Sequence, residues 1–192
     1  IIAMNPFSKE TLTQHQLKNN CLCLMTPEKQ QIKSSMQFLG RIHENYVKAL
    51  NAHFNEDKHN YLALNLNNKL ISTILSNQNS VFLSDRIDTD FEANTDLLNN
   101  FVSYDTAYYQ LIYEISNKVI TAINLILDDN NALRDIYISG GFNRNEIFIK
   151  YLSVIKPSVT VRVPDVKNET ALGAALLMKD YLKQAQFLTT LL

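Results

Sequence analysis

The sequence predicts an α/β fold on the strength of two observations. Short segments that are rich in β-branched residues, or in which apolar and polar residues alternate, are interspersed with longer segments that carry apolar residues at helical spacing. The stretch 135–178 also has, in order, the patterns of a strand, a Gly-Gly turn, a helix, a strand and a helix. The chain has 192 residues, 46% of them hydrophobic, which suits one domain with a substantial core. We therefore expect a single domain over 1–192, built as a mixed sheet flanked by helices.

The first forty residues predict a small strand-rich unit. Residues 1–4 are strand-like, a turn follows over 5–8, and a threonine at 11 or 13 is placed to cap a short helix. The runs 21–26 and 32–38 are typical of an antiparallel hairpin, and Gly40 is interpreted as its end.

The two cysteines, Cys21 and Cys23, stand two residues apart on the first strand of that hairpin and share a sheet face. Two thiolates do not complete a zinc site, and no second pair of ligands is evident. We expect buried, reduced thiols, which fits a reducing cytoplasm.

Three helices are predicted in the middle of the chain. Apolar residues at helical spacing cover 41–54, 61–75 and 105–127. The asparagines within 61–75 weaken that prediction. The third segment has the broadest apolar stripe and is expected to be the central helix against the sheet.

The polar residues of this half suggest little chemistry by themselves. The acidic run 85–96 lacks the glycine and terminal glutamate of a calcium loop, so we interpret it as a solvated loop and predict no metal site. His43 and Glu44 are interpreted as surface residues of a helix. A net charge of −1 gives no electrostatic reason to expect binding to nucleic acid or to an anionic membrane. No apolar run approaches the roughly 20 residues of a membrane helix.

The stretch 135–178 holds the candidate site. A strand at 136–138 runs into Gly140 and Gly141, Asn143 is predicted to cap the next helix with Glu146, and Pro157 stops that helix. A strand at 159–163 precedes a last helix, whose small face is expected to pack against another backbone. That face consists of Ala171, Gly173, Ala174 and Ala175. A Gly-Gly turn between a strand and a helix N-terminus presents N–H donors and a positive dipole end, which favours phosphate or a nucleotide.

The amino-acid sequence of this stretch resembles the C-terminal end of FGGY-family carbohydrate kinases. The segments ISGGFNRNEIFIKYL, PSVTV and NETALGAALL match a family pattern of strand, Gly-Gly turn, helix, short strand and Ala-rich helix. The matching positions are Gly140, Gly141, Phe142, Asn145, Glu169 and Ala171 to Ala175. The likeness is strong over 135–180 and weaker over 5–40. The central segment TAYYQLIYEIS departs from the family pattern, because it lacks the Arg-Ala and Glu-Gly pairs found in many members.

The resemblance implies a ribonuclease-H-like (actin-like ATPase) fold that binds ATP and Mg²⁺. The whole enzyme would transfer the γ-phosphoryl group to a sugar hydroxyl, with a ketose or deoxyketose as substrate. Gly140 and Gly141 would approach the α-phosphate and ribose, while Phe142 and Asn145 would border the adenine, Asn145 through its amide.

The resemblance also implies that this chain is the C-terminal ATP-binding domain, truncated at its N-terminus. The catalytic residues would lie in a missing N-terminal domain of the same protein, so we expect the isolated chain to be inactive. A homodimer is left open. The alternatives are a non-kinase actin-like ATPase switch and a catalytically inert binding or dimerisation module.

Overall fold

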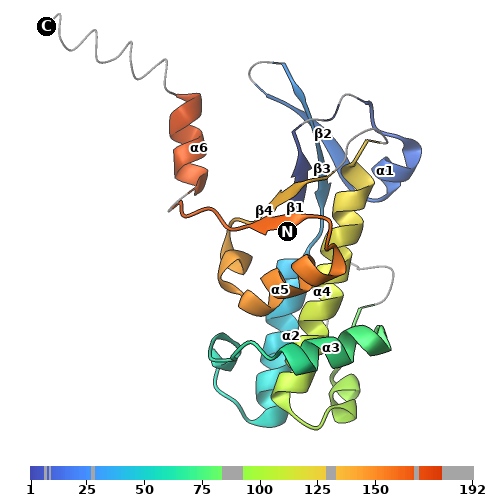
Figure 1. Cartoon of the computed structure of the whole chain (residues 1–192), viewed down its shortest axis with the longest axis vertical. Helices are drawn as coiled ribbons and strands as arrows, with labels where there is room; N and C mark the ends of the chain where they lie inside the picture. Colours follow the sequence, from blue (N-terminus) through green and yellow to red (C-terminus); the bar gives the residue numbers. More distant parts are fainter. Residues whose placement is uncertain are drawn as a thin grey trace, which may run out of the picture.

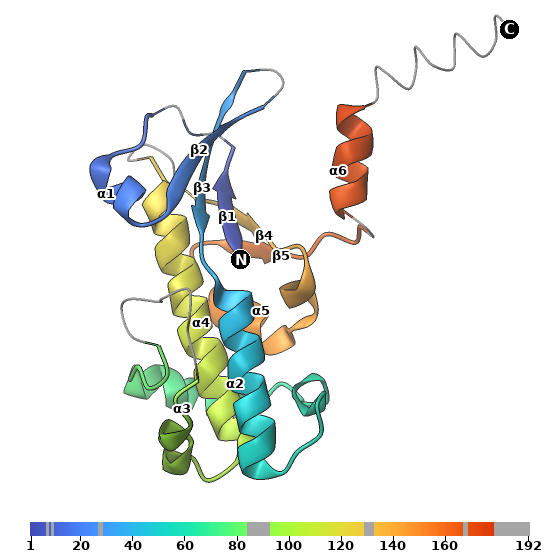
Figure 2. The ribbon, with the colours of Figure 1, turned by 180° about the vertical axis from the view of Figure 1, so that it is seen from behind.

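Two long helices form the axis of the molecule, and two small sheets lie at one end of them (Figures 1 and 2). The computed structural model describes residues 1–6, 8, 10–26, 29–83, 93–128, 133–166 and 169–178. The strands of this part of the chain are β1 (Ile2–Asn5), β2 (Cys21–Met25), β3 (Gln31–Met36), β4 (Asp135–Tyr137) and β5 (Thr160–Arg162). Its α-helices are α1 (Gln14–Lys18), α2 (Leu39–Phe54), α3 (Asn68–Asn77), α4 (Tyr104–Ile126), α5 (Glu146–Ile155) and α6 (Glu169–Leu177). Short 3-10 helices cover Asn60–Leu62, Thr95–Asn100 and Gly141–Arg144.

The α/β prediction is confirmed, but the strands form two ladders rather than one mixed sheet. β3 lies between β1 and β2 and is antiparallel to both, whereas β4 and β5 form a separate parallel pair. The labels of Figure 2 place the strands in the order β2, β3, β1, β4, β5 across the molecule. Among the described strands, the two ladders therefore follow one another, and β1 does not pair with β4.

Helix α4 is the core of the fold, as its broad apolar stripe predicts. It contacts α2, α3 and α5 as well as the inner face of β1 and β3. Its fully buried side chains include Tyr108, Leu111, Ile112 and Ile115. Ser103 begins the helix by accepting a hydrogen bond from the Thr106 N–H at 3.3 Å.

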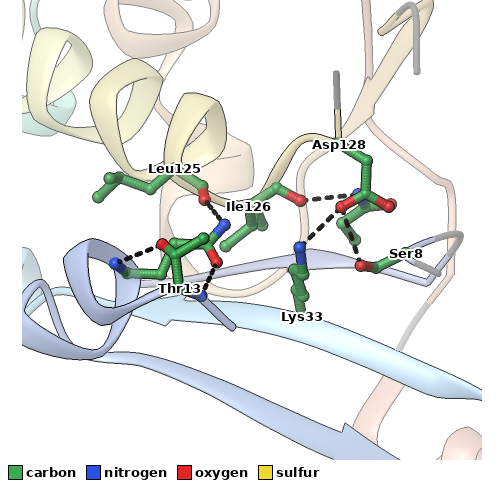
Figure 3. A network of polar contacts seen from close by, with 8 residues as sticks. Ser8, Thr13, Lys33, Leu125, Ile126 and Asp128 are labelled. Atoms are coloured by element: carbon green, nitrogen blue, oxygen red, sulfur yellow. Dashed lines mark hydrogen bonds and ion pairs between the residues drawn. The ribbon is translucent and has the colours of Figure 1, made fainter. Parts of the chain in front are cut away.

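A buried polar network joins the three-stranded sheet to the C-terminal end of α4 (Figure 3). Lys33 of β3 forms an ion pair with Asp128 at 2.8 Å, and both side chains are almost fully buried. The Ser8 hydroxyl donates to the same Asp128 oxygen at 3.1 Å. Two side-chain amides bind the last carbonyls of the helix, Asn5 to Ile126 at 2.8 Å and Gln16 to Leu125 at 2.7 Å. Carbonyls that a helix end leaves without partners are thereby satisfied.

The predicted N-terminal unit is largely confirmed. The strands at the start of the chain and the hairpin are present, and Thr13 caps α1 in a capping box with Gln16. Gly40 does not end the hairpin, because β3 stops at Met36 and Gly40 lies in the first turn of α2.

The prediction of a continuous helix over 61–75 is wrong. A 3-10 turn ends at Leu62 and α3 begins only at Asn68, with the Asn67 side chain accepting from the Leu70 N–H. The physical reason is that the asparagines bind backbone locally, and that the Tyr109 hydroxyl holds the intervening segment. That hydroxyl donates to the Asn65 carbonyl at 2.7 Å and accepts from the Asn67 N–H at 2.8 Å.

The expectation for the cysteines holds for one of them. Both are free thiols, but Cys21 is buried and Cys23 is exposed. The buried thiol of Cys21 has its pKa raised by burial. Cys21 lies at the start of β2, the strand that α1 contacts. The remaining residues of β2, Cys23 included, are exposed.

Most of the acidic run 85–96 lies outside the described residues. Asp96, within them, belongs to the 3-10 helix Thr95–Asn100. In the part of the chain that is described, no three His, Cys, Asp or Glu side chains gather as a metal ion would require. Nor does any described helix combine the length and the apolar character needed to cross a bilayer.

Candidate nucleotide site

The Gly-Gly turn is an open surface at the end of β4. The Ile138 N–H still bonds the Arg162 carbonyl at 2.9 Å, and the chain then leaves the strand through Ser139. Gly140 has φ +77° and ψ −162°, a conformation that side-chain-bearing residues rarely adopt. A Cβ added at Gly140 or Gly141 would meet no atom within 4 Å, and both residues are exposed. The backbone here is accessible to a ligand.

Asn145, rather than Asn143, caps the helix after the turn. The segment Gly141–Arg144 makes one 3-10 turn, so α5 starts two residues later than predicted, at Glu146. The Asn145 side-chain oxygen accepts from the Phe148 N–H at 3.0 Å. The expected pairing of Asn143 with Glu146 is therefore wrong, because Asn143 lies inside the 3-10 turn.

A cluster of aromatic rings packs around Phe142 of the Gly-Gly turn. The half-buried Phe142 ring meets the His43 ring edge-to-face, with centroids 5.2 Å apart, and lies 5.0 Å from Phe148. His43 also packs against Tyr61 and Tyr108, with centroids 5.3 Å and 5.8 Å away. These contacts bring α2, the Asn60–Leu62 turn, α4 and the Gly-Gly turn to one place.

A hydrogen-bond chain runs through this cluster to Asn145. The Asn145 amide donates to the Tyr108 hydroxyl at 2.8 Å, and that hydroxyl lies 3.1 Å from His43 Nε2. The direction of this second hydrogen bond follows the His43 tautomer: Nε2 accepts from the hydroxyl in one neutral tautomer and donates to it in the other. Burial lowers the pKa of His43 to about 4, so the ring is neutral at pH 7. Burial also raises the pKa of Tyr108, which stays protonated.

The four predicted site residues lie together on the turn, and three residues that the sequence analysis did not include lie against them. Gly140, Gly141, Phe142 and Asn145 follow one another along the turn. The additional residues are His43, Tyr61 and Tyr108. His43 was interpreted as a surface residue; it is instead partly buried, because it lies beside the apolar stripe that α2 turns toward α4.

A second polar centre lies on α4 at Glu114, which is 3% exposed. Its carboxylate accepts from the backbone N–H groups of Val81, Phe82 and Leu83 at 2.7 to 2.9 Å, and from the Gln110 amide at 2.7 Å. This arrangement holds the segment after α3 against the core. An open hollow at the C-terminal end of α2 includes none of the turn residues in its lining, which is formed by Lys48, Asn51, Ala52, Asn55, Glu56, Asp57 and Lys58.

The fold is similar to that of one solved structure. The structure is similar to the crystal structure of a carbohydrate kinase from Novosphingobium aromaticivorans, with a TM-score of 0.62 and 15% sequence identity. The match covers 93% of this chain and 38% of that kinase, so the chain spans well under half of its length. No protein-family model matches the sequence. No curated protein matches it either.

Proposed function

We propose that this chain is the ATP-binding part of a carbohydrate kinase of the FGGY type, with a ribonuclease-H-like fold. In the whole protein, the γ-phosphoryl group of ATP would pass to the hydroxyl of a ketose or deoxyketose. The observation that carries the proposal is the likeness of nearly the whole chain to a carbohydrate kinase fold, with an exposed Gly-Gly turn at the end of a strand. The strand order across the two ladders, with the parallel pair beside β1, agrees with such a fold (Figure 2).

The residues of the turn are compatible with a nucleotide. Open space above Gly140 and Gly141 lets phosphate and ribose approach the backbone, where N–H groups can donate. Phe142 offers the edge of an apolar ring for the adenine. An Asn side chain has two N–H donors and two acceptor lone pairs. The contacts with Tyr108 and Phe148 use one donor and one lone pair of Asn145, so its amide retains the means to bind the base.

Phosphoryl transfer depends on positioning and on charge stabilisation more than on covalent chemistry by the protein. In our proposal, this chain holds and orients the nucleotide. The described residues do not form a Mg²⁺ site, so we assign the ion no ligand here. The general base and the sugar contacts are assigned to the rest of a longer protein.

The proposal is tested with the variant Gly141→Val and a calorimetric titration with ATP. Gly141 has an ordinary backbone conformation and open space around it, so a valine should fold normally while projecting into the ligand's path. We expect ATP binding at least about tenfold weaker, a loss of about 1.4 kcal/mol.

The matched control is Ala52→Val, which adds comparable bulk on an exposed turn of α2 away from the site. Its ATP affinity should equal that of the unmodified chain. An unchanged affinity in Gly141→Val would remove the nucleotide from this turn. Turnover of ATP and sugar by the isolated chain would contradict our assignment of catalysis to the rest of the protein.

A further inference from the structure

The side-chain amide of Asn145 is held from two sides. Its oxygen accepts from the Phe148 N–H at 3.0 Å, and its nitrogen donates to the Tyr108 hydroxyl at 2.8 Å. The first bond fixes the oxygen, because an amide that is turned over would direct its own N–H groups at the N–H of Phe148. The second bond fixes the nitrogen. Together the two bonds define the plane in which the amide lies.

The Tyr108 hydroxyl is itself firmly placed. Its ring is 0% exposed on the central helix α4 and is stacked on the Tyr104 ring, with centroids 6.1 Å apart and planes 8° apart. The Nε2 atom of His43 lies 3.1 Å from the hydroxyl. Burial raises the pKa of Tyr108, so the hydroxyl stays protonated. Since water does not reach this ring, it acts on a bound nucleotide only through the amide of Asn145.

The remaining valences of the Asn145 amide suit adenine. One N–H and one lone pair stay free after the two bonds, and the side chain is only half-buried. An asparagine amide pairs with the N7 acceptor and the N6 amino donor of adenine. Guanine has two acceptors on the same edge, N7 and O6. A fixed amide would therefore direct its oxygen at O6 of guanine without a hydrogen between the two atoms.

We propose that Tyr108 is a positioning residue of the nucleotide site, and that it makes the site select adenine over guanine by fixing the Asn145 amide. This inference rests on the proposed function, since it requires the base to lie against the Gly-Gly turn. Tyr108 lies in the segment TAYYQLIYEIS, which departs from the family pattern, so the resemblance does not supply this role. Without the hydroxyl, only the bond to Phe148 would hold the amide, which could then turn its nitrogen toward guanine.

Calorimetric titrations of the 192-residue chain with ATP and with GTP test this role. The readout is the dissociation constant for GTP divided by that for ATP, because a purely structural loss would weaken both nucleotides alike. The unmodified chain should prefer ATP. In Tyr108→Phe this ratio should fall at least about fivefold, the lower end of what one bidentate side-chain pair contributes to base discrimination. An unchanged ratio would overturn the proposal.

The matched control is Tyr151→Phe on α5. Its hydroxyl belongs to an equally buried ring and has no hydrogen-bond partner among the described residues, so its removal should leave the ratio unchanged. A second comparison uses Asn145→Ser, which keeps an oxygen for the helix cap but removes the amide. Adding Tyr108→Phe to Asn145→Ser should change the ratio no further. A further fall in this double variant would show that Tyr108 acts by another route.

The outcomes separate this inference from the proposed function. If Gly141→Val weakens ATP binding while Tyr108→Phe leaves the ratio unchanged, only the role of Tyr108 fails. If the unmodified chain does not bind ATP, both proposals fail. If Tyr108→Phe does not fold, nitrogen relaxation in the unmodified chain measures the order parameter of the Asn145 amide. We expect a value close to the roughly 0.85 of rigid backbone, and a value below about 0.6 would show that the amide is not held.

Discussion

At the scale of single residues, His43 is the side chain whose environment most changes its chemistry. It lies under Phe142, faces Tyr61 and Tyr108, and has a pKa lowered to about 4 by burial, against 6.5 in an unfolded chain. Because burial disfavours the charged imidazolium, the neutral ring is the form that the fold selects. The Tyr108 hydroxyl lies between this ring and the Asn145 amide and contacts both.

This linkage predicts a pH dependence of stability. Above pH 6.5, His43 is neutral in both the folded and unfolded states. As the pH falls from 6.5 toward 4, the unfolded chain takes up a proton that the folded chain refuses, so the free energy of unfolding falls by up to about 3 kcal/mol. His43→Phe should remove this part of the pH dependence, measured by urea unfolding at several pH values. His15→Phe, which alters an exposed ring of α1, should keep it; parallel curves for His43→Phe and the unmodified chain would contradict the assignment.

At the scale of elements, Glu114 shows how one side chain fixes a segment that has no regular structure. Three consecutive N–H groups, from Val81 to Leu83, converge on its carboxylate. Such charge-assisted hydrogen bonds are about twice as strong as neutral ones. The connection between α3 and the following turn thus owes its position to α4 rather than to its own sequence.

Removing this carboxylate should release the segment. In Glu114→Ala, we expect the amide hydrogens of residues 81–83 to lose their protection from exchange, because their acceptor is gone. The free energy of unfolding should fall by roughly 2 kcal/mol or more, as for loss of hydrogen bonds to a charged group. The comparison is Glu44→Ala, an exposed carboxylate on α2 that should leave exchange unchanged. Retained protection at 81–83 would show that other contacts hold the segment.

At the scale of the whole molecule, the Lys33–Asp128 pair joins the sheet to the end of the central helix (Figure 3). The two residues are 95 positions apart in sequence, and each is nearly inaccessible to water. Burial makes the pair sensitive to the loss of one partner, because the remaining charge would lie uncompensated in the protein interior, where the dielectric constant is low.

Lys33→Met should therefore destabilise the fold by about 3 to 5 kcal/mol, since Asp128 would stay buried without its cation. Thermal and urea unfolding measure the loss. Arg162→Met breaks the exposed pair between Arg162 and Asp135 and should change stability little. Adding Asp128→Leu to Lys33→Met should recover much of the loss, and a Lys33→Met chain as stable as the original would show that the pair is not a structural requirement.

Sequence patterns determined most elements of this protein and the location of its candidate site. The strands, the capped helix after Thr13, the long helix α4 and the Gly-Gly turn all follow from local periodicity, caps and glycines, which are properties of neighbouring residues. The tertiary structure alone decided which of them meet. It placed His43 and Tyr108 beneath the turn, moved the cap of α5 to Asn145, interrupted the helix expected at 61–75 and paired Lys33 with Asp128. Most of these depend on contacts between residues far apart in the chain, such as those of the Tyr108 hydroxyl with Asn145 and of the Tyr109 hydroxyl with Asn67, whose energies local pattern does not contain.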